Sequence, residues 1–268
     1  MKSKSAEIYV FSGTGNTFSA VQSICAILND NNCQTILHPI PGAFLSAKND
    51  CALGLAFPTA CFSTYPFVLD FIKNIPPTTS DREVFLVSTM AASSFGMPQS
   101  IRKLLIEKGY RPIGVCLLKM PSNYGKHANS KTRASQKIIS DAHFQATNFA
   151  GQMLIGKTSW EKKSSPFVAQ LYKFAQKNFI WKLFRNLFTL KINQNICTKC
   201  GFCKNICPHD AIEKINENYN ISKRCVSCQH CAAFCPESAI GIGSMPFTPY
   251  RLVEYKEMST KIKTSSFQ

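Results

Sequence analysis

The sequence predicts an α/β domain built on a doubly wound parallel sheet, followed by a small α+β module organised around cysteines. Two observations carry this prediction. Over residues 1–155, short apolar segments alternate with segments of helical periodicity, as expected for strands that helices cover on both faces. Near the other end, the pattern Cys-x2-Cys-x2-Cys-x3-Cys-Pro occurs twice, from Cys197 and again from Cys225. Such a duplication indicates a module with two equivalent metal sites.

The composition restricts the class of protein. The chain has 268 residues, 45% of them hydrophobic and 17% charged, which is typical of a folded globular protein. No run of about 20 apolar residues appears, so we expect no spanning helix. The N-terminus lacks the apolar core of a secretory signal, so we expect a cytoplasmic protein of an anaerobic or low-oxygen organism, with reduced thiols. The net charge of +16 suits nucleic acid, an anionic membrane or acidic proteins as partners.

Five strands and four helices are expected in the first domain. The strands are predicted at residues 7–11, 34–40, 51–57, 83–88 and 112–118, and the helices near 18–28, 66–73, 98–108 and 131–155. The predicted strand order is 2-1-3-4-5, which gathers ligands at the carboxyl ends of strands 1, 3 and 4.

The loop after the first strand suits a phosphate group. It contains Ser12, Gly13, Thr14, Gly15, Asn16 and Thr17. A Walker loop needs a Lys, which is missing, and a dinucleotide fingerprint needs a third Gly where Phe18 stands. Hydroxyl groups, backbone amides and a helix N-terminus remain, and these suit a terminal phosphate monoester.

This loop resembles the Ser/Thr-x-Thr-Gly-x-Thr loop of flavodoxins, and the resemblance implies FMN as the cofactor. It also implies that the loops after strands 3 and 4 hold the flavin ring. The candidates there are Pro58, Thr59, Ala60, Cys61, Phe62, Ser63, Thr89, Met90, Ala91, Ala92, Ser93, Phe95 and Gly96. Phe62, Tyr65 and Phe95 are candidate stacking residues, with core packing as the alternative. We interpret Cys61 as a buried thiol rather than a redox group.

The segment after the fifth strand reads Met-Pro-Ser-Asn-Tyr and is similar to one found in flavodoxin–ferredoxin fusion proteins. The similarity implies that Asn123 and Tyr124 form a wall of the flavin site, although a capped turn would also explain them. The following loop, residues 122–130 with His127, either closes a small-molecule pocket or is an exposed linker.

A basic connector spans residues 156–194. Within it, residues 166–190 have helical apolar spacing with lysines on much of the other side. We expect this helix to dock on its neighbouring domains; peripheral contact with an anionic membrane is the alternative. Nucleic acid binding is not expected, because no reading element accompanies the charge.

The cysteine module is predicted at residues 195–245, followed by a tail at 246–268. Zinc sites usually take two Cys pairs separated by a loop, whereas here four cysteines crowd together twice, each time before a Pro. The pattern resembles bacterial two-cluster 4Fe–4S ferredoxins, in which the fourth Cys of each run binds the other cluster. The resemblance implies one cluster on Cys197, Cys200, Cys203 and Cys235, and another on Cys225, Cys228, Cys231 and Cys207.

Taken together, the chain resembles the flavodoxin–ferredoxin fusion family. The resemblance implies a redox protein that passes electrons between FMN and two 4Fe–4S clusters, with acidic redox proteins of ferredoxin or flavodoxin type as partners. The alternative is an FMN-dependent reductase of a small molecule that the clusters supply with electrons. A third possibility is a flavin-free protein with a structural or sensing role. The sequence assigns no catalytic residue.

Overall fold

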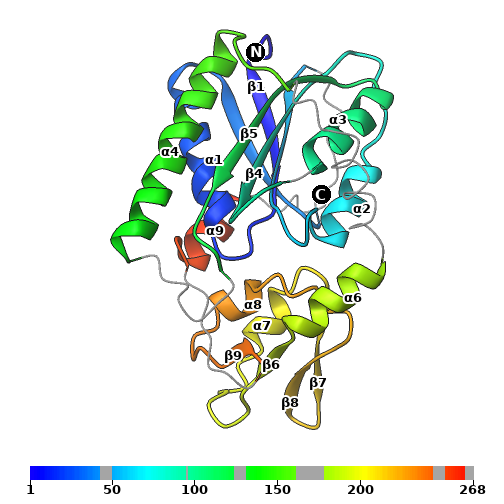
Figure 1. The fold of residues 1–268 in the computed structure, drawn as a ribbon, viewed down its shortest axis with the longest axis vertical. Helices are drawn as coiled ribbons and strands as arrows, with labels where there is room; N and C mark the ends of the chain where they lie inside the picture. Colours follow the sequence, from blue (N-terminus) through cyan, green and yellow to red (C-terminus); the bar gives the residue numbers. More distant parts are fainter. Residues whose placement is uncertain (43–49, 95, 124–130, 161–177, 244–250, 263–268) are drawn as a thin grey trace.

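The computed structural model describes residues 1–42, 50–94, 96–123, 131–160, 178–243 and 251–262. A five-stranded parallel sheet with helices on both faces stands above a smaller module that carries the cysteines (Figure 1). The strands are β1 (Ser5–Val10), β2 (Gln34–Pro39), β3 (Ala52–Pro58), β4 (Glu83–Met90) and β5 (Arg111–Lys119). Their order is β2-β1-β3-β4-β5 and every pairing is parallel, which confirms the predicted doubly wound, flavodoxin-like fold.

Each face of the sheet carries its own hydrophobic core. Helices α1 (Asn16–Asp30) and α4 (Arg133–Leu154) cover one face, where Ile8 and Val10 of β1 belong to the core. Helices α2 (Pro66–Lys73) and α3 (Met97–Glu107) cover the other, to which Tyr9 and Phe11 contribute. Successive residues of a strand point to opposite faces, so the apolar run of β1 serves both cores. This burial explains why the strands lack polar alternation.

The cysteine module consists of short elements. Strand β6 (Leu190–Ile192) pairs antiparallel with β9 (Ile240–Ile242), and β7 (Ile212–Ile215) forms a hairpin with β8 (Asn218–Ile221). Helices α7 (Phe202–Asn205) and α8 (His230–Ala233) lie within the two cysteine motifs. The module packs below the carboxyl ends of the large sheet, the edge where ligands bind in doubly wound folds (Figure 1).

Part of the predicted connector helix lies within the described residues. Helix α6 runs over Asn178–Leu187, whereas residues 166–177 fall outside the described part. Trp181 is 9% exposed and joins the core beside α2, where its ring lies 5.8 Å from that of Tyr65. Leu187 remains 66% exposed. The described part of the connector therefore docks on the first domain through Trp181.

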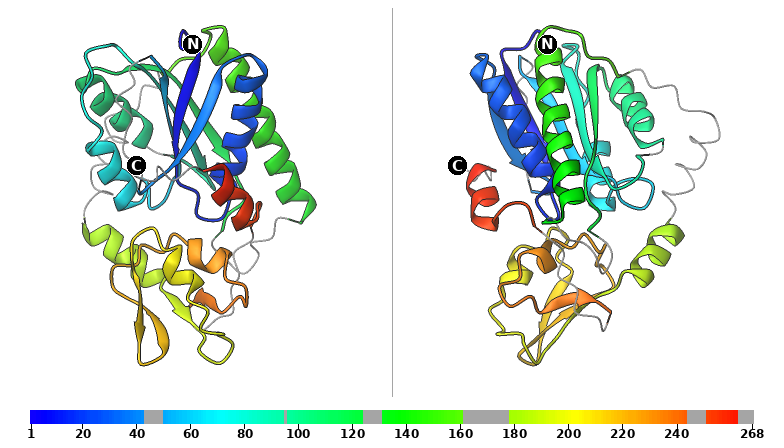
Figure 2. Two further views of the ribbon diagram at one scale, coloured as in Figure 1. Left: turned by 180° about the vertical axis from the view of Figure 1, so that it is seen from behind. Right: turned by 60° about the vertical axis from the view of Figure 1, so that its left-hand side comes forward.

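The segment predicted as a tail contains a folded element that returns to the first domain. Helix α9 (Tyr255–Lys261) lies beside the first domain (Figure 2), and its first residue, Tyr255, also contacts Phe202 of the cysteine module. Ile262 forms a bridge to Leu37 at the end of β2, and Gln22 of α1 donates a hydrogen bond to Glu257. Of the described helices, none has the length and apolar character that crossing a bilayer requires.

Candidate functional site

The predicted phosphate loop leads directly from β1 into α1. Gly15 adopts a left-handed conformation with φ of 94° and precedes the first helical residue, Asn16. The Ser12 hydroxyl accepts a hydrogen bond from the Phe18 amide at 3.2 Å, which satisfies one donor of the helix N-terminus. The Thr17 hydroxyl bonds that of Thr89 at 2.8 Å, which ties the loop to the end of β4. The loop therefore sits at the carboxyl edge with its conformation set by its own hydroxyls.

A cleft opens beside this loop. The loop lines it with Ser12, Gly13, Thr14, Asn16 and Thr17. The ends of β3 and β4 add Pro58, Thr59, Thr89, Met90 and Ala91. Asn123, predicted as a wall residue, lines the cleft with Met120–Ser122 and donates a 2.6 Å hydrogen bond to the Thr14 hydroxyl. Polar groups from four segments therefore converge on the predicted flavin site.

Other predicted ring contacts lie elsewhere. Ala60, Cys61, Phe62 and Ser63 do not line this cleft, and Phe62 is 45% exposed. Burial alone raises the pKa of the Cys61 thiol to about 11, as expected for an unreactive thiol. Tyr65 fits both the ring-stacking and the core-packing interpretation, because it borders the cleft and its ring packs edge-on against that of Phe11 at 5.5 Å. Phe95, Tyr124 and His127 fall outside the described residues.

A second cleft adjoins the first at Met90. It measures about 460 Å³, and its lining includes Ala92, Ser93, Ser94, Lys119 and Asp141. Two residues predicted to contact the flavin ring, Ala92 and Ser93, therefore face this neighbouring space. Gly96 precedes the first residue of α3 as its N-cap and lines neither cleft.

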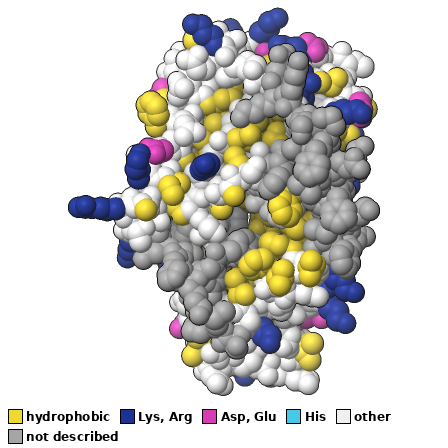
Figure 3. Space-filling model, viewed as in Figure 1, with side chains coloured by type: hydrophobic (Ala, Val, Ile, Leu, Met, Phe, Trp, Pro, Cys, Tyr) yellow, Lys and Arg dark blue, Asp and Glu magenta, His cyan; other side chains and the backbone are white. Residues whose placement is uncertain are grey.

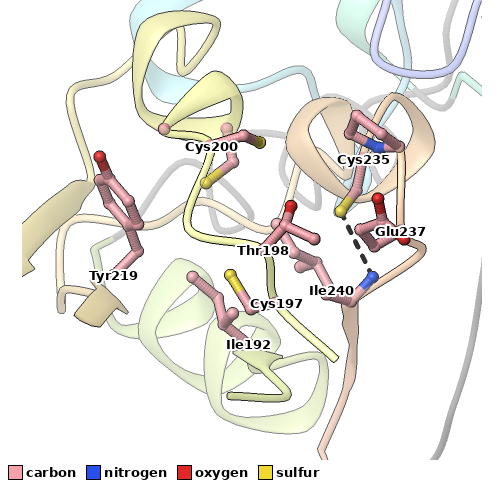
Figure 4. Close-up of a pocket in the computed structure, with 12 residues that line it drawn as sticks. Ile192, Cys197, Thr198, Cys200, Tyr219, Cys235, Glu237 and Ile240 are labelled. Carbon is pink, nitrogen blue, oxygen red and sulfur yellow. Dashed lines mark hydrogen bonds between the residues drawn. The ribbon is translucent and has the colours of Figure 1, made fainter. Parts of the chain in front are cut away.

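The structure places the cysteines that the resemblance assigns to each cluster as follows. Cys197, Cys200, Cys203 and Cys235 line one cavity together with apolar residues such as Ile192 and Ile240. Figure 4 shows Cys197, Cys200 and Cys235 around this cavity. Cys225, Cys228, Cys231 and Cys207 are the remaining four: burial raises the pKa of Cys231 well above its ordinary value, and the nearby Cys228, Cys225, Cys207 and Cys203 raise it further. We call these the first and the second cysteine site.

The surroundings of both sites suit thiolate ligands of an iron–sulfur cluster. The Ala239 amide donates a 3.3 Å hydrogen bond to the Cys235 sulfur, and the Ala211 amide does the same for Cys207. Such N–H donors stabilise negative charge on sulfur in an apolar cavity. Among the described residues, no three His, Cys, Asp or Glu side chains gather tightly enough to hold a single metal ion. The four cysteines of a 4Fe–4S cluster bind at different corners of a cube, so their thiols lie farther apart than the ligands of a single metal ion.

Sequence reasoning missed the contact between the second cysteine site and the phosphate loop. Cys228 lines the cleft beside Gly13, and a Cβ atom at Gly13 would overlap the Cys228 carbonyl oxygen. His230 Nδ1 lies 3.1 Å from the Ser12 carbonyl and 3.0 Å from that of Gly13. Both partners only accept, so Nδ1 carries the proton. Gly13 is the sequence signal of this close approach, but a glycine alone does not name its partner.

Comparison with known proteins identifies the cysteine module. The 4Fe-4S binding domain model matches residues 190–213. A ferredoxin-like protein in the nif region of Sinorhizobium fredii is 43% identical over 53 residues, which cover 17% of this chain and 83% of that protein. The matched model indicates 4Fe–4S binding. With the fold described above, these findings define an iron–sulfur electron-transfer protein with a flavodoxin-like domain.

Solved structures align with the first domain at low similarity. Flavodoxin 2 from Bacillus cereus is 16% identical, with a TM-score of 0.43, and the alignment covers 57% of this chain and 99% of that one. A Fusobacterium nucleatum flavodoxin bound to flavin mononucleotide is 14% identical, with a TM-score of 0.40, covering 58% and 98%. The fold assignment rests on the strand order rather than on these alignments. The chain belongs to the ferredoxin-like family through its C-terminal module, in fusion with a flavodoxin-like domain.

Proposed function

We propose that this protein carries electrons between FMN, held in the cleft beside the phosphate loop, and two 4Fe–4S clusters, and exchanges them with a partner redox protein. The observation that carries the proposal is the contact of Cys228 and His230 with Ser12 and Gly13, which brings a cysteine site to the flavin cleft. When bound, FMN would take up or release two electrons with protons from water, and each cluster would take up or release one electron.

The phosphate loop has the groups that an FMN phosphate needs. Thr14 and Asn16 line the cleft beside backbone amides at the start of α1, whose helix dipole favours an anion. Asn123 orients the Thr14 hydroxyl from the opposite wall. No Lys or Arg lines this cleft among the described residues, so the binding relies on neutral donors and the helix dipole. Residues around Met90, Ala91 and Pro58 would border the ring.

The two clusters would be held by the crossed cysteine groups. The first site would use Cys197, Cys200, Cys203 and Cys235, and the second Cys225, Cys228, Cys231 and Cys207. The two sites adjoin through Cys203 and Cys231, which share one small hydrophobic core. Apolar packing of Leu190, Ile212 and Ile240 in this core keeps water from the space between them.

Acidic redox proteins are the proposed partners. The chain has a net charge of +16, and the face seen in Figure 3 carries more Lys and Arg than Asp and Glu side chains. Complementary charge accelerates association and makes its rate depend on salt. A basic partner would be repelled.

The test is anaerobic purification followed by cofactor assay, redox titration and stopped-flow mixing with an acidic ferredoxin. We expect FMN and iron in the protein, and electron exchange whose rate falls as ionic strength rises. Purified protein that contains iron but binds no added FMN would contradict the proposal. Exchange that is equally fast at all ionic strengths would contradict the acidic partner.

A second candidate function is reduction of a small molecule at the flavin. The cleft of about 460 Å³ next to Met90 favours it, because Ser93, Lys119 and Asp141 supply polar contacts for a ligand. Turnover of a small molecule, measured with reduced protein and no acceptor protein, would support this function over that of a carrier.

A further inference from the structure

The two cysteine sites stand in unequal positions relative to the flavin cleft. Cys228 of the second site lines that cleft, and Val226 and Cys228 pack against the core that contains Tyr65 and Phe11. Among the described residues, the first site is lined by residues of the cysteine module, from Ile192 to Ile240, and its Cys200 is exposed. One site therefore meets the first domain, and the other faces away from it.

We call the contact between the second cysteine site and the phosphate loop the inner junction, and His230 lies in it. It lies in the second motif between Cys228 and Cys231 and is 8% exposed. Its Nδ1–H donates to the Ser12 and Gly13 carbonyls of the phosphate loop. Its ring also packs against Phe234 at 5.1 Å and Tyr255 at 5.9 Å, so its orientation is restricted. A single side chain thus connects the second cysteine site, the phosphate loop and the segment that carries α9.

The duplication provides a comparison within the chain. Phe202 occupies in the first motif the position that His230 occupies in the second, because each follows its second cysteine by two residues. Phe202 packs edge-on against Tyr255 at 5.0 Å and cannot donate a hydrogen bond. Of these two equivalent positions, only the one in the second motif has a side chain that can make this polar contact to the phosphate loop.

Electron tunnelling slows steeply with distance, so the order of the sites sets the route of electrons. We propose that the cluster on Cys225, Cys228, Cys231 and Cys207 exchanges single electrons with the flavin, that the cluster beside exposed Cys200 exchanges them with the partner protein, and that His230 is the positioning residue of the inner junction. This inference rests on the proposed function. Each transfer moves one electron, so two transfers, with protons from water, complete one flavin reduction when the partner is the reductant.

The order of the sites is tested by electron–nuclear double resonance on full-length protein loaded with FMN and iron and then reduced. The spin of a reduced cluster beside the phosphate loop couples to the FMN phosphorus. We expect this coupling in the wild type and in Cys197→Ser, which perturbs the first site, and its loss in Cys207→Ser, which perturbs the second. Coupling that persists in Cys207→Ser but vanishes in Cys197→Ser would reverse the order. No coupling in wild type with both cofactors bound would also overturn the proposal.

The role of His230 is tested with variants that leave every cysteine in place. Flash photoreduction of the flavin, followed optically, gives the rate at which electrons reach the clusters. We expect His230→Leu to slow this rate by about tenfold or more, because small displacements of reacting groups have large kinetic effects. His230→Asn retains an N–H near Nδ1 and should restore most of the rate. Phe202→Leu, the matched control, should leave it unchanged.

These outcomes separate the inference from the function on which it rests. An equal slowing in His230→Leu and Phe202→Leu would show a general packing effect and remove the positioning role. No recovery in His230→Asn would likewise remove it. If wild-type protein with full iron content binds no FMN, the proposed function itself fails, and cofactor assay detects this before any variant is made.

Discussion

Gly13 of the phosphate loop packs directly against the backbone carbonyl of Cys228, in the second cysteine motif. A Cβ atom at Gly13 would overlap that oxygen, so any other residue would force the two backbones apart. Gly15, two residues later, lies against the returning C-terminal segment, because a Cβ atom there would stand 2.7 Å from the Val253 side chain. Two segments far apart in the sequence thus meet the phosphate loop at its glycines.

Gly13→Ala should separate the phosphate loop from the cysteine module. We expect weaker FMN binding and a lower free energy of unfolding, measured by flavin fluorescence titration and by chemical denaturation. The overlap is with a backbone atom, which no side-chain rotation relieves. Gly151→Ala is the matched control, because a Cβ atom at this α4 position meets nothing within 4 Å. Equal effects of the two substitutions would contradict the contact.

Cys207→Ser should damage the second cysteine site although Cys207 belongs to the first motif. We expect loss of about half the iron. The remaining electron paramagnetic resonance spectrum should match that of Cys225→Ser and differ from that of Cys197→Ser. Cys33→Ser, in the first domain, should leave the iron content unchanged. A Cys207→Ser spectrum that matches Cys197→Ser instead would disprove the crossed pairing.

Thr14→Val should weaken FMN binding while the loop keeps its shape. The substitution preserves volume but removes a hydroxyl that faces the cleft and accepts a hydrogen bond from Asn123. Hydrogen bonds to charged groups contribute about 1.5–3 kcal/mol, so the dissociation constant should rise by about 10- to 100-fold in isothermal titration. Thr147→Val, on the exposed side of α4, is the control. An unchanged affinity in Thr14→Val would place the phosphate elsewhere.

Arg82→Met should destabilise the first domain strongly. The buried Arg82 guanidinium donates to the Glu7 carboxylate at 3.2 Å and to the Cys51 carbonyl at 2.8 Å. Its loss leaves the Glu7 carboxylate buried without this partner, so unfolding should become easier by about 3–5 kcal/mol in denaturant titration. Lys137→Met breaks an exposed pair with Asp141 and should cost at most about 1 kcal/mol. Similar losses in the free energy of unfolding for both variants would contradict this prediction.

His38→Phe should reduce the sensitivity of stability to pH. Burial lowers the pKa of His38 below its ordinary 6.5, although the nearby Glu7 opposes this. Protonation of His38 therefore favours the unfolded chain. The neutral His38 ring contributes stability that is fully present above about pH 6.5 and is lost as the pH falls through the pKa of the folded state. Neither ring nitrogen has a hydrogen-bond partner among the described residues, and Phe can keep the stacking on Tyr9.

The measurement for His38→Phe is denaturation between about pH 7.5 and pH 5.5. We expect the variant to lose less stability than the wild type over this range. Some dependence should remain, because burial also lowers the pKa of His143. An identical slope in both proteins would mean that His38 does not titrate differently on folding.

Local patterns were enough to predict most of the fold. Strands buried on both faces need continuous apolar runs, as in β3, and the phosphate loop needs small residues where β1 turns into α1. The position of Met90 at the cleft followed from the rule that loops at the carboxyl ends of parallel strands converge, whereas that of Asn123 followed from the resemblance to flavodoxin–ferredoxin fusion proteins. The sequence did not indicate that residues 60–63 lie outside this cleft, because this depends on left-handed backbone conformations at Cys61 and Phe62.

The sequence by itself determined the two architectures and the cysteine pattern, because both depend on spacing within short segments. Only the tertiary structure decided which cysteine site meets the phosphate loop, since the two motifs have the same spacing and differ in their interfaces. The choice depends on Gly13, which leaves room for the Cys228 carbonyl. It also depends on His230, whose N–H donates to the Ser12 and Gly13 carbonyls. Contacts between residues so distant in the chain leave no periodicity in the sequence, so packing alone reveals them.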